Sequence, residues 1–151
     1  MNTTKNVNKS PKNHRELEKA ICEQLKMVLE PIDWICETTF KSPHSGPDLV
    51  AKVTKKDRSN KVLLIECKSQ LRPSTFPQVV NQLKSHATGR KHDALILASS
   101  YISDRMAHLI ESEGFSWIDL AGNCSITVPG GIYIERRYYP PVHKPPEPQV
   151  N

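Results

Sequence analysis

One stretch decides how this chain is organised: Lys61-Val-Leu-Leu-Ile-Glu-Cys-Lys-Ser-Gln70. Its apolar run 62–65 has the length and the β-branched content of a strand that is buried on both faces within an α/β sheet. Because side chains alternate across a strand, Glu66 and Lys68 project from one face, while Cys67 points to the other and offers its backbone carbonyl beside them. A buried charge is costly without a partner, so the two charges indicate a metal ion, a ligand or a third residue.

The third residue is expected one strand earlier. Segment 46–53 (Gly-Pro-Asp-Leu-Val-Ala-Lys-Val) has the pattern of a strand opened by Gly-Pro, and the polar segment 54–60 joins it to the apolar run as a turn. In such an antiparallel hairpin, the start of the first strand lies next to the end of the second. We therefore expect Asp48 to lie beside Glu66 and Lys68.

These residues match a known signature. Pro47-Asp48, followed one strand later by Glu66-Cys67-Lys68, resembles the motif of the restriction-endonuclease-like, or PD-(D/E)xK, nuclease superfamily. An acid-x-Lys tripeptide alone is a weak signal in a chain so rich in charge, and its position at the end of the most strand-like run gives it weight. The alternative is an ion pair on the solvated face of an edge strand.

The resemblance covers about residues 14–100 and implies an α/β fold with a restriction-endonuclease-like core. From the sequence we predict a mixed central β-sheet of about five strands, flanked by helices on both faces, in the order αβββαβ. One nuclease-like domain should span 14–137, between a disordered basic arm at 1–13 and a Pro-rich disordered tail at 138–151. The arm could also contact nucleic acid, and the tail could be a polyproline ligand. The expected elements are a helix at 14–30, strands at 34–40, 46–53 and 62–67, a helix at 78–87, a strand at 93–99, a helix at 103–113, and short strands at 115–120, 124–128 and 131–135.

The resemblance also implies a metal-dependent endonuclease that hydrolyses nucleic-acid phosphodiester bonds, with DNA as the expected substrate. Asp48, Glu66 and the backbone carbonyl of Cys67 would hold Mg²⁺, or Mn²⁺, because hard oxygen ligands suit these ions. The ion would polarise the phosphate and lower the pKa of the attacking water, and Lys68 would orient that water or offset the developing negative charge. A non-catalytic nucleic-acid-binding or regulatory protein with the same fold is the alternative.

Two helices are expected to add to this site. In this superfamily a glutamate of the first helix often faces the metal, and the run from Glu18 to Leu25 looks like that of archaeal Holliday-junction resolvases, which implies this role for Glu18. Glu16 and Glu23 are its competitors. A glutamine of the helix after the active strand is often close as well, which implies Gln82. Any of these side chains could instead simply face solvent. As in the resolvase-like members, we expect a homodimer that presents two sites.

The net charge of +5 and the pI near 9.1 favour a polyanionic partner without requiring one. The basic residues expected to contact phosphates are Lys55, Lys56 and Arg58 in the hairpin turn, and Arg72, Lys84, Arg90 and Lys91 after the active strand. The turn residues could equally be a solvated tip. In the loop before Asp48, Ser42, His44 and Ser45 could touch a phosphate or serve only the turn.

Other features concern compartment and cofactors. The four cysteines are scattered, with no Cys-x-x-Cys pair, which argues against zinc and indicates free thiols in a reducing compartment. No run approaches the roughly 20 apolar residues of a membrane span, and the N-terminus lacks the apolar core of a signal peptide. We therefore expect a cytoplasmic protein with no membrane segment.

The run 117–123 (Trp-Ile-Asp-Leu-Ala-Gly-Asn) resembles one that follows such nuclease-like cores in bacterial sequences, and Asp119 and Asn123 in it are expected to serve a turn.

Overall fold

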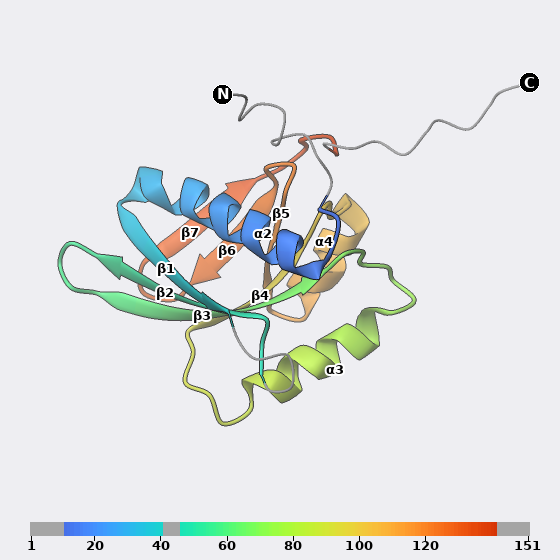
Figure 1. Ribbon diagram of the computed structural model, residues 1–151, viewed down its shortest axis with the longest axis horizontal. Coiled ribbons are helices and arrows are strands. Elements are labelled where there is room, and N and C mark those ends of the chain that lie inside the picture. The colour runs from blue at the N-terminus through green and yellow to red at the C-terminus, as the bar shows by residue number, and fades with distance from the viewer. Residues whose placement is uncertain (1–10, 41–45, 142–151) are drawn as a thin grey trace, which may run out of the picture.

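A computed structural model describes residues 11–40 and 46–141, and Figure 1 shows one central sheet with helices on both of its faces. The helices are α2 (His14–Leu29), α3 (Phe76–Ala87) and α4 (Asp104–Ser112), with a short 3-10 helix, η1 (Glu30–Ile32), after α2. The strands are β1 (Trp34–Phe40), β2 (Leu49–Lys55), β3 (Asn60–Lys68), β4 (Ala94–Ser99), β5 (Ser116–Asp119), β6 (Cys124–Val128) and β7 (Ile132–Arg136). The predicted mixed sheet is confirmed, but within the described residues it contains seven strands rather than about five, because the three short C-terminal strands continue it.

The strands are hydrogen-bonded to one another in chain order, from β1 to β7. β1 to β3 form an antiparallel meander, β3, β4 and β5 run parallel, and β6 and β7 return antiparallel. Each parallel connection needs a crossover, which α3 and α4 provide. The register pairs Lys68 with Ser99 and Ser99 with Asp119, so the C-terminal ends of the three parallel strands lie along one edge of the sheet.

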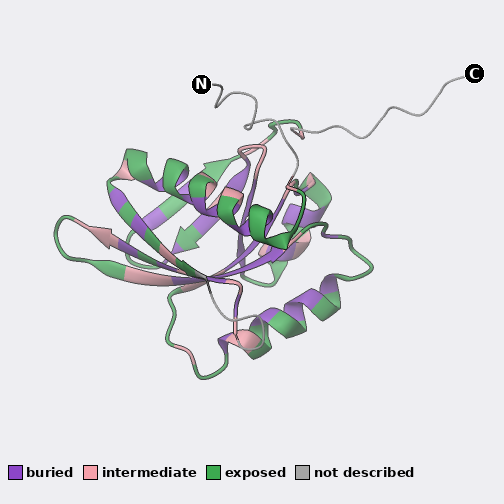
Figure 2. Ribbon diagram, viewed as in Figure 1, coloured by how far each residue is buried: buried purple, intermediate pink, exposed green. Residues whose placement is uncertain are grey.

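Two hydrophobic layers hold the sheet between the helices. On one face, the apolar stripe of α2 and residues from each of the strands β1 to β7 form one hydrophobic cluster. On the other face, α3 and α4 pack on Leu97 and Trp117, and Figure 2 shows that each helix buries only the side that faces the sheet. Cys67 belongs to the α2 layer, whereas Glu66 and Lys68 contact α3. The alternation predicted for this strand is therefore present.

The starts of two helices are set by local chemistry. The side-chain oxygen of Asn13 accepts the N–H of Glu16 at 2.9 Å, so α2 begins at His14, as predicted. Helix α3 begins at Phe76, two residues earlier than predicted, because Pro77 lies in its first turn, where a missing N–H has no cost. The start of α2 lies beside Asp48, since the His14 ring is 3.3 Å from the Asp48 carboxylate.

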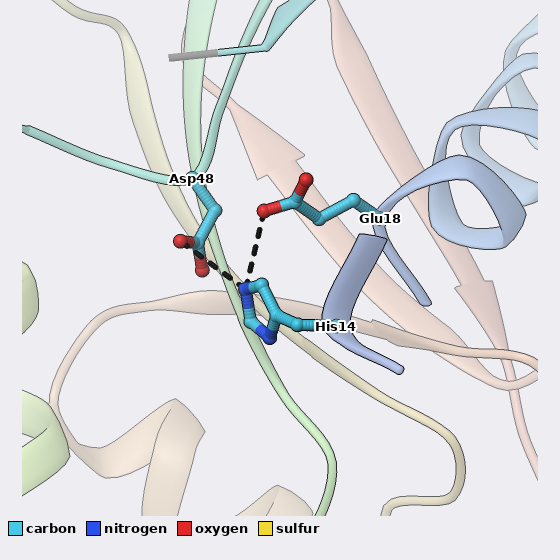
Figure 3. A group of neighbouring side chains, drawn as sticks. All are labelled: His14, Glu18 and Asp48. Carbon is cyan, nitrogen blue, oxygen red and sulfur yellow. Dashed lines mark ion pairs between the residues drawn. The ribbon is translucent and has the colours of Figure 1, made fainter. Parts of the chain in front are cut away.

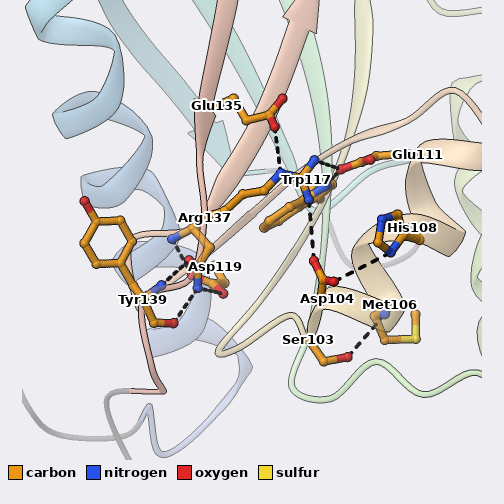
Figure 4. A network of polar contacts seen from close by, with 11 residues as sticks. Ser103, Asp104, Met106, His108, Glu111, Trp117, Asp119, Glu135, Arg137 and Tyr139 are labelled. Atoms are coloured by element: carbon orange, nitrogen blue, oxygen red, sulfur yellow. Dashed lines mark hydrogen bonds and ion pairs between the residues drawn. The ribbon is translucent and has the colours of Figure 1, made fainter.

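A polar network ties the segment after β7 to the sheet, and Figure 4 shows it from close by. Asp119 is fully buried and accepts hydrogen bonds from the backbone N–H groups of Ile102, Ala121 and Asn123 and from the side-chain amide of Asn123. The same amide donates to the carbonyl oxygen of Tyr139 at 3.0 Å, and the Asn123 oxygen accepts the Tyr139 N–H at 2.8 Å. Asp119 and Asn123 thus serve the turn and also hold the chain two residues beyond the predicted domain boundary.

Residues 1–10 of the predicted arm (1–13), residues 142–151 of the predicted tail (138–151) and the loop residues Ser42, His44 and Ser45 lie outside the described residues. None of the described helices is long and apolar enough to cross a membrane. The four cysteines are free and buried, and burial raises the pKa of each thiol. Their side chains are therefore disfavoured as thiolate ligands.

Candidate functional site

Asp48 lies at the open end of the β2–β3 hairpin, directly before the first residue of β2. The last register pair of these strands is Leu49 with Ile65, so the chain diverges just where Asp48 begins. One carboxylate oxygen of Asp48, Oδ2, accepts the backbone N–H of Cys67 at 2.8 Å. The hairpin therefore brings Asp48 to the end of β3, as the sequence predicts.

Helix α3 contacts both charged residues of β3. The side chain of Glu66 is 2% exposed, and its Oε1 lies 2.8 Å from Nδ1 of His86. Nζ of Lys68 donates to Oε1 of Gln82 at 2.5 Å. Gln82 and His86 are four residues apart, so one stripe of α3 faces both strand residues. The alternative of an exposed ion pair on an edge strand is wrong, because β3 has a neighbour on each side and Glu66 is buried.

Helix α2 supplies a second pair of side chains, shown in Figure 3. Nε2 of His14 lies 3.1 Å from Oε2 of Glu18 and 3.3 Å from Oδ1 of Asp48. Only a tenth of the Glu18 side chain is exposed, whereas Glu16 is exposed and Glu23 is 73% exposed. Of the three candidate glutamates on α2, Glu18 is the one that the fold brings to Asp48.

Within the described residues, the ligand atoms of His14, Glu18 and Asp48 lie within 4.8 Å of one another. Glu66 is not part of this trio. Its negative charge nevertheless acts on the trio, since it contributes to the raised pKa of Glu18. The site thus has two parts, one on each side of Asp48. Toward α2, the imidazole of His14 lies between the carboxylates of Glu18 and Asp48. Toward α3, Glu66 contacts His86 and Lys68 contacts Gln82.

Burial and mutual repulsion shift the acidity of two of these groups. Burial raises the pKa of Glu66, the hydrogen bond from His86 opposes this rise, and the charge of Asp48 adds to it. Burial also raises the pKa of Glu18, again with a contribution from Asp48, while the nearby His14 and Arg15 oppose it. The folded chain therefore resists holding these carboxylates charged together, and a bound cation would remove that resistance.

Two residues near the site, His14 and His86, were not predicted from the sequence, whereas Arg90 was expected among the basic residues that follow the active strand. A Cβ placed on Gly46, whose φ is +90°, would lie 2.3 Å from Nη2 of Arg90, so the guanidinium packs directly on this glycine, two residues before Asp48. The spacing of each histidine was a usable signal, because His14 is four residues from Glu18 and His86 four from Gln82. The approach of Arg90 to Gly46 could not be foreseen in this way, since the two residues are far apart in the sequence.

Three of the predicted phosphate-binding residues lie far from Asp48, and two others are paired with neighbouring side chains. Lys55, Lys56 and Arg58 are at the tip of the hairpin, and the seven residues of β2 separate them from Asp48 by roughly 20 Å at about 3.3 Å per residue. Lys84 pairs with Glu113 at 3.4 Å, and Arg72 bonds to Gln70 at 2.6 Å. The structure therefore gathers Glu18, Asp48, Glu66, Lys68 and Gln82, and it places the basic tip of the hairpin at the far end of β2 from them.

No family model and no curated protein matches this chain. Among solved structures, it is similar to a repair endonuclease from Pyrococcus abyssi, with 14% sequence identity and a TM-score of 0.43. The match covers 72% of this chain and 48% of that one, so this chain spans about half the length of that protein.

Proposed function

We propose that this chain is a nuclease that uses a divalent metal ion to hydrolyse phosphodiester bonds of DNA. The observation that carries the proposal is the convergence of Glu18, Asp48 and Glu66 with Lys68 at the end of β3. Two of these carboxylates, Glu18 and Glu66, are buried, and their pKa values are raised by burial and by the charge of Asp48. Carboxylate oxygens are the ligands that Mg²⁺ and Mn²⁺ prefer, so the donor set fits such an ion.

In this proposal Asp48 and Glu66 hold the ion together with the carbonyl oxygen of Cys67. The N–H of Cys67 points to Asp48, and in a strand the C=O of a residue faces the same neighbour as its N–H, so we expect this carbonyl on the same side. When bound, Mg²⁺ or Mn²⁺ would polarise the phosphate and lower the pKa of the attacking water. The backbone N–H of Cys67 and the imidazole of His86 fix the carboxylates of Asp48 and Glu66 for this purpose.

Lys68 is the residue proposed to act on the substrate. Its Nζ is held by the oxygen of Gln82, and the side chain is only partly buried, so the ammonium can meet a phosphate from solvent. There it would orient the water or offset the charge that develops on the phosphate oxygens. Arg90, on the loop beside Gly46, is the further cation that a nucleic-acid backbone would meet near Asp48. We keep the expectation of a homodimer that presents two such sites.

The first test measures metal binding separately from cleavage. Mg²⁺ and Mn²⁺ are titrated calorimetrically into the wild type, Asp48→Ala and Lys68→Ala, with Glu23→Gln as a control on the exposed side of α2. We expect Asp48→Ala to weaken binding by at least about tenfold. Lys68→Ala should bind the ions as the wild type does, yet cleave at least about a hundredfold more slowly.

The substrates are duplex, single-stranded and branched DNA, and RNA. Metal-dependent cleavage of any DNA by the wild type, abolished in Asp48→Ala, would support the proposal. A wild type that binds nucleic acid but no divalent ion would overturn it in favour of a non-catalytic nucleic-acid-binding protein. A site that binds the ion but cuts RNA alone would overturn the choice of DNA.

A further inference from the structure

The imidazole of His14 lies in the site at a position that suits an additional metal ligand. Its Nε2 lies 3.1 Å from Glu18 Oε2 and 3.3 Å from Asp48 Oδ1 (Figure 3). Two donors bound at right angles to one ion, at about 2.1 Å each, are about 3.0 Å apart. The spacings from the nitrogen to each of the two oxygens are thus close to those of neighbouring ligands on one ion, and all three atoms lie within 4.8 Å of one another.

The position of His14 is imposed by the helix. The Asn13 cap fixes His14 as the first residue of α2, and Glu18 follows one turn later on the same face. The ring is half exposed, yet its Nε2 faces the carboxylates rather than water. A comparable spacing occurs on α4, where His108 and Asp104 are also four residues apart, but there Nδ1 of His108 is 3.9 Å from the carboxylate and both side chains are largely exposed.

The nature of the donors determines which ion such a site prefers. Mg²⁺ takes oxygen ligands, whereas an imidazole nitrogen binds first-row transition ions far better. We propose that His14 is a ligand, together with Glu18 and Asp48, and that it makes this site selective for a first-row divalent transition ion over Mg²⁺. The inference rests on the proposed metal site and names the class of ion that the site takes.

The test compares two ions on the full chain, without using cleavage as the readout. Co²⁺ and Mg²⁺ are titrated calorimetrically into the wild type, His14→Gln and His108→Gln, and the nitrogen coupling of bound Mn²⁺ is recorded by pulsed electron paramagnetic resonance. We expect His14→Gln to weaken Co²⁺ binding by at least about tenfold and Mg²⁺ binding by less than about threefold. His108→Gln, which removes the comparable pair on α4, should bind both ions as the wild type does.

The imidazole coupling should be present in the wild type and in His108→Gln and absent in His14→Gln. If the wild type binds both ions but His14→Gln leaves their affinity ratio and the nitrogen coupling unchanged, the role of His14 is overturned while the proposed nuclease site stands. If the wild type binds no divalent ion, the proposed site and this inference are overturned together. Circular dichroism of each variant checks that the helix content is unchanged.

Discussion

Nδ1 of His86 lies 2.8 Å from Oε1 of Glu66, and this contact joins helix α3 to a carboxylate buried in the middle of the sheet. One turn earlier on the helix, Gln82 accepts a hydrogen bond from Lys68. Between these two residues, Leu83 is fully buried in the layer that holds α3 against the sheet. The orientation of both charged residues of β3 therefore depends on how α3 packs, although nothing in β3 itself specifies it.

The first prediction concerns Glu66→Gln in the metal-free protein. Because burial raises the pKa of Glu66, the folded state at pH 7 holds its charge at a cost, and glutamine removes that charge at nearly the same size. We expect the free energy of unfolding at pH 7 to rise by on the order of 1 kcal/mol, and metal binding to be abolished. Urea denaturation in the presence of a chelator measures this. A clearly less stable variant would mean that Glu66 serves mainly as a structural partner of His86.

The second prediction concerns pH. A carboxyl whose pKa is raised by folding contributes stability below its unfolded pKa, here near 4.5, and loses it as pH rises through the folded value. Glu18 and Glu66 should therefore make the metal-free protein less stable as pH rises from about 4.5 toward neutrality. Urea midpoints measured across this range should fall less steeply in Glu18→Gln than in the wild type. Glu23→Gln, at an exposed position on the same helix, should leave the profile unchanged.

The hairpin and its two charged residues could be predicted because both depend on local periodicity. Alternation along β3 placed Glu66 and Lys68 on one face, and an antiparallel turn placed Asp48 beside them. The contact of His86 with Glu66 could not be predicted in the same way, because it depends on the angle at which α3 packs on the sheet. The turn that carries the basic residues of the hairpin could be predicted from its polar composition. The distance of these residues from Asp48 could not, because the length of β2 sets it.

The third prediction concerns Gly46→Ala. The φ of +90° disfavours any Cβ here, and the added methyl would also meet the guanidinium of Arg90. We expect the free energy of unfolding to fall by roughly 1–3 kcal/mol and metal binding to weaken, because the loop that delivers Asp48 must shift. Thermal and urea unfolding, with calorimetric titration of Mn²⁺, measure both effects.

Gly89→Ala is the matched control for Gly46→Ala. Its φ is +77°, but an added Cβ would meet nothing within 4 Å. It should therefore show the backbone strain alone, about 1 kcal/mol, with metal binding intact. The double variant Gly46→Ala, Arg90→Ala should regain the unfolding free energy that Gly46→Ala loses beyond the loss in Gly89→Ala. Equal destabilisation in Gly46→Ala and Gly89→Ala would show that the contact with Arg90 has no energetic weight.

The fourth prediction concerns Asn123→Ala. This change removes both bonds to the backbone of Tyr139 and leaves the buried carboxylate of Asp119 with fewer donors. We expect the free energy of unfolding to fall by about 2–3 kcal/mol, since a buried polar group that loses its partner keeps its desolvation penalty. Hydrogen exchange should also show faster exchange of the Tyr139 amide. Unchanged exchange at Tyr139 would mean that other contacts, such as those of Arg137 with Glu111 and Glu135, hold this segment.

The last prediction concerns the basic tip of the hairpin, changed as Lys55, Lys56 and Arg58→Ser. If a duplex bound at Asp48 continues along the hairpin, a distance of roughly 20 Å corresponds to about six base pairs at 3.4 Å each. The triple variant should then bind a duplex of about 24 base pairs more weakly, with its salt dependence reduced by up to about 0.9 for each phosphate that the tip no longer neutralises. Its affinity for a duplex of about eight base pairs, which can occupy the metal site without reaching the tip, should stay that of the wild type, and so should its metal affinity.

The control for the hairpin variant is a second triple variant, Lys26, Arg105 and Arg136→Ser, which removes the same charge from exposed residues on three other elements. Equal weakening by both triple variants would mean that only net charge matters, and an unchanged salt dependence in the hairpin variant would remove the tip from the binding surface.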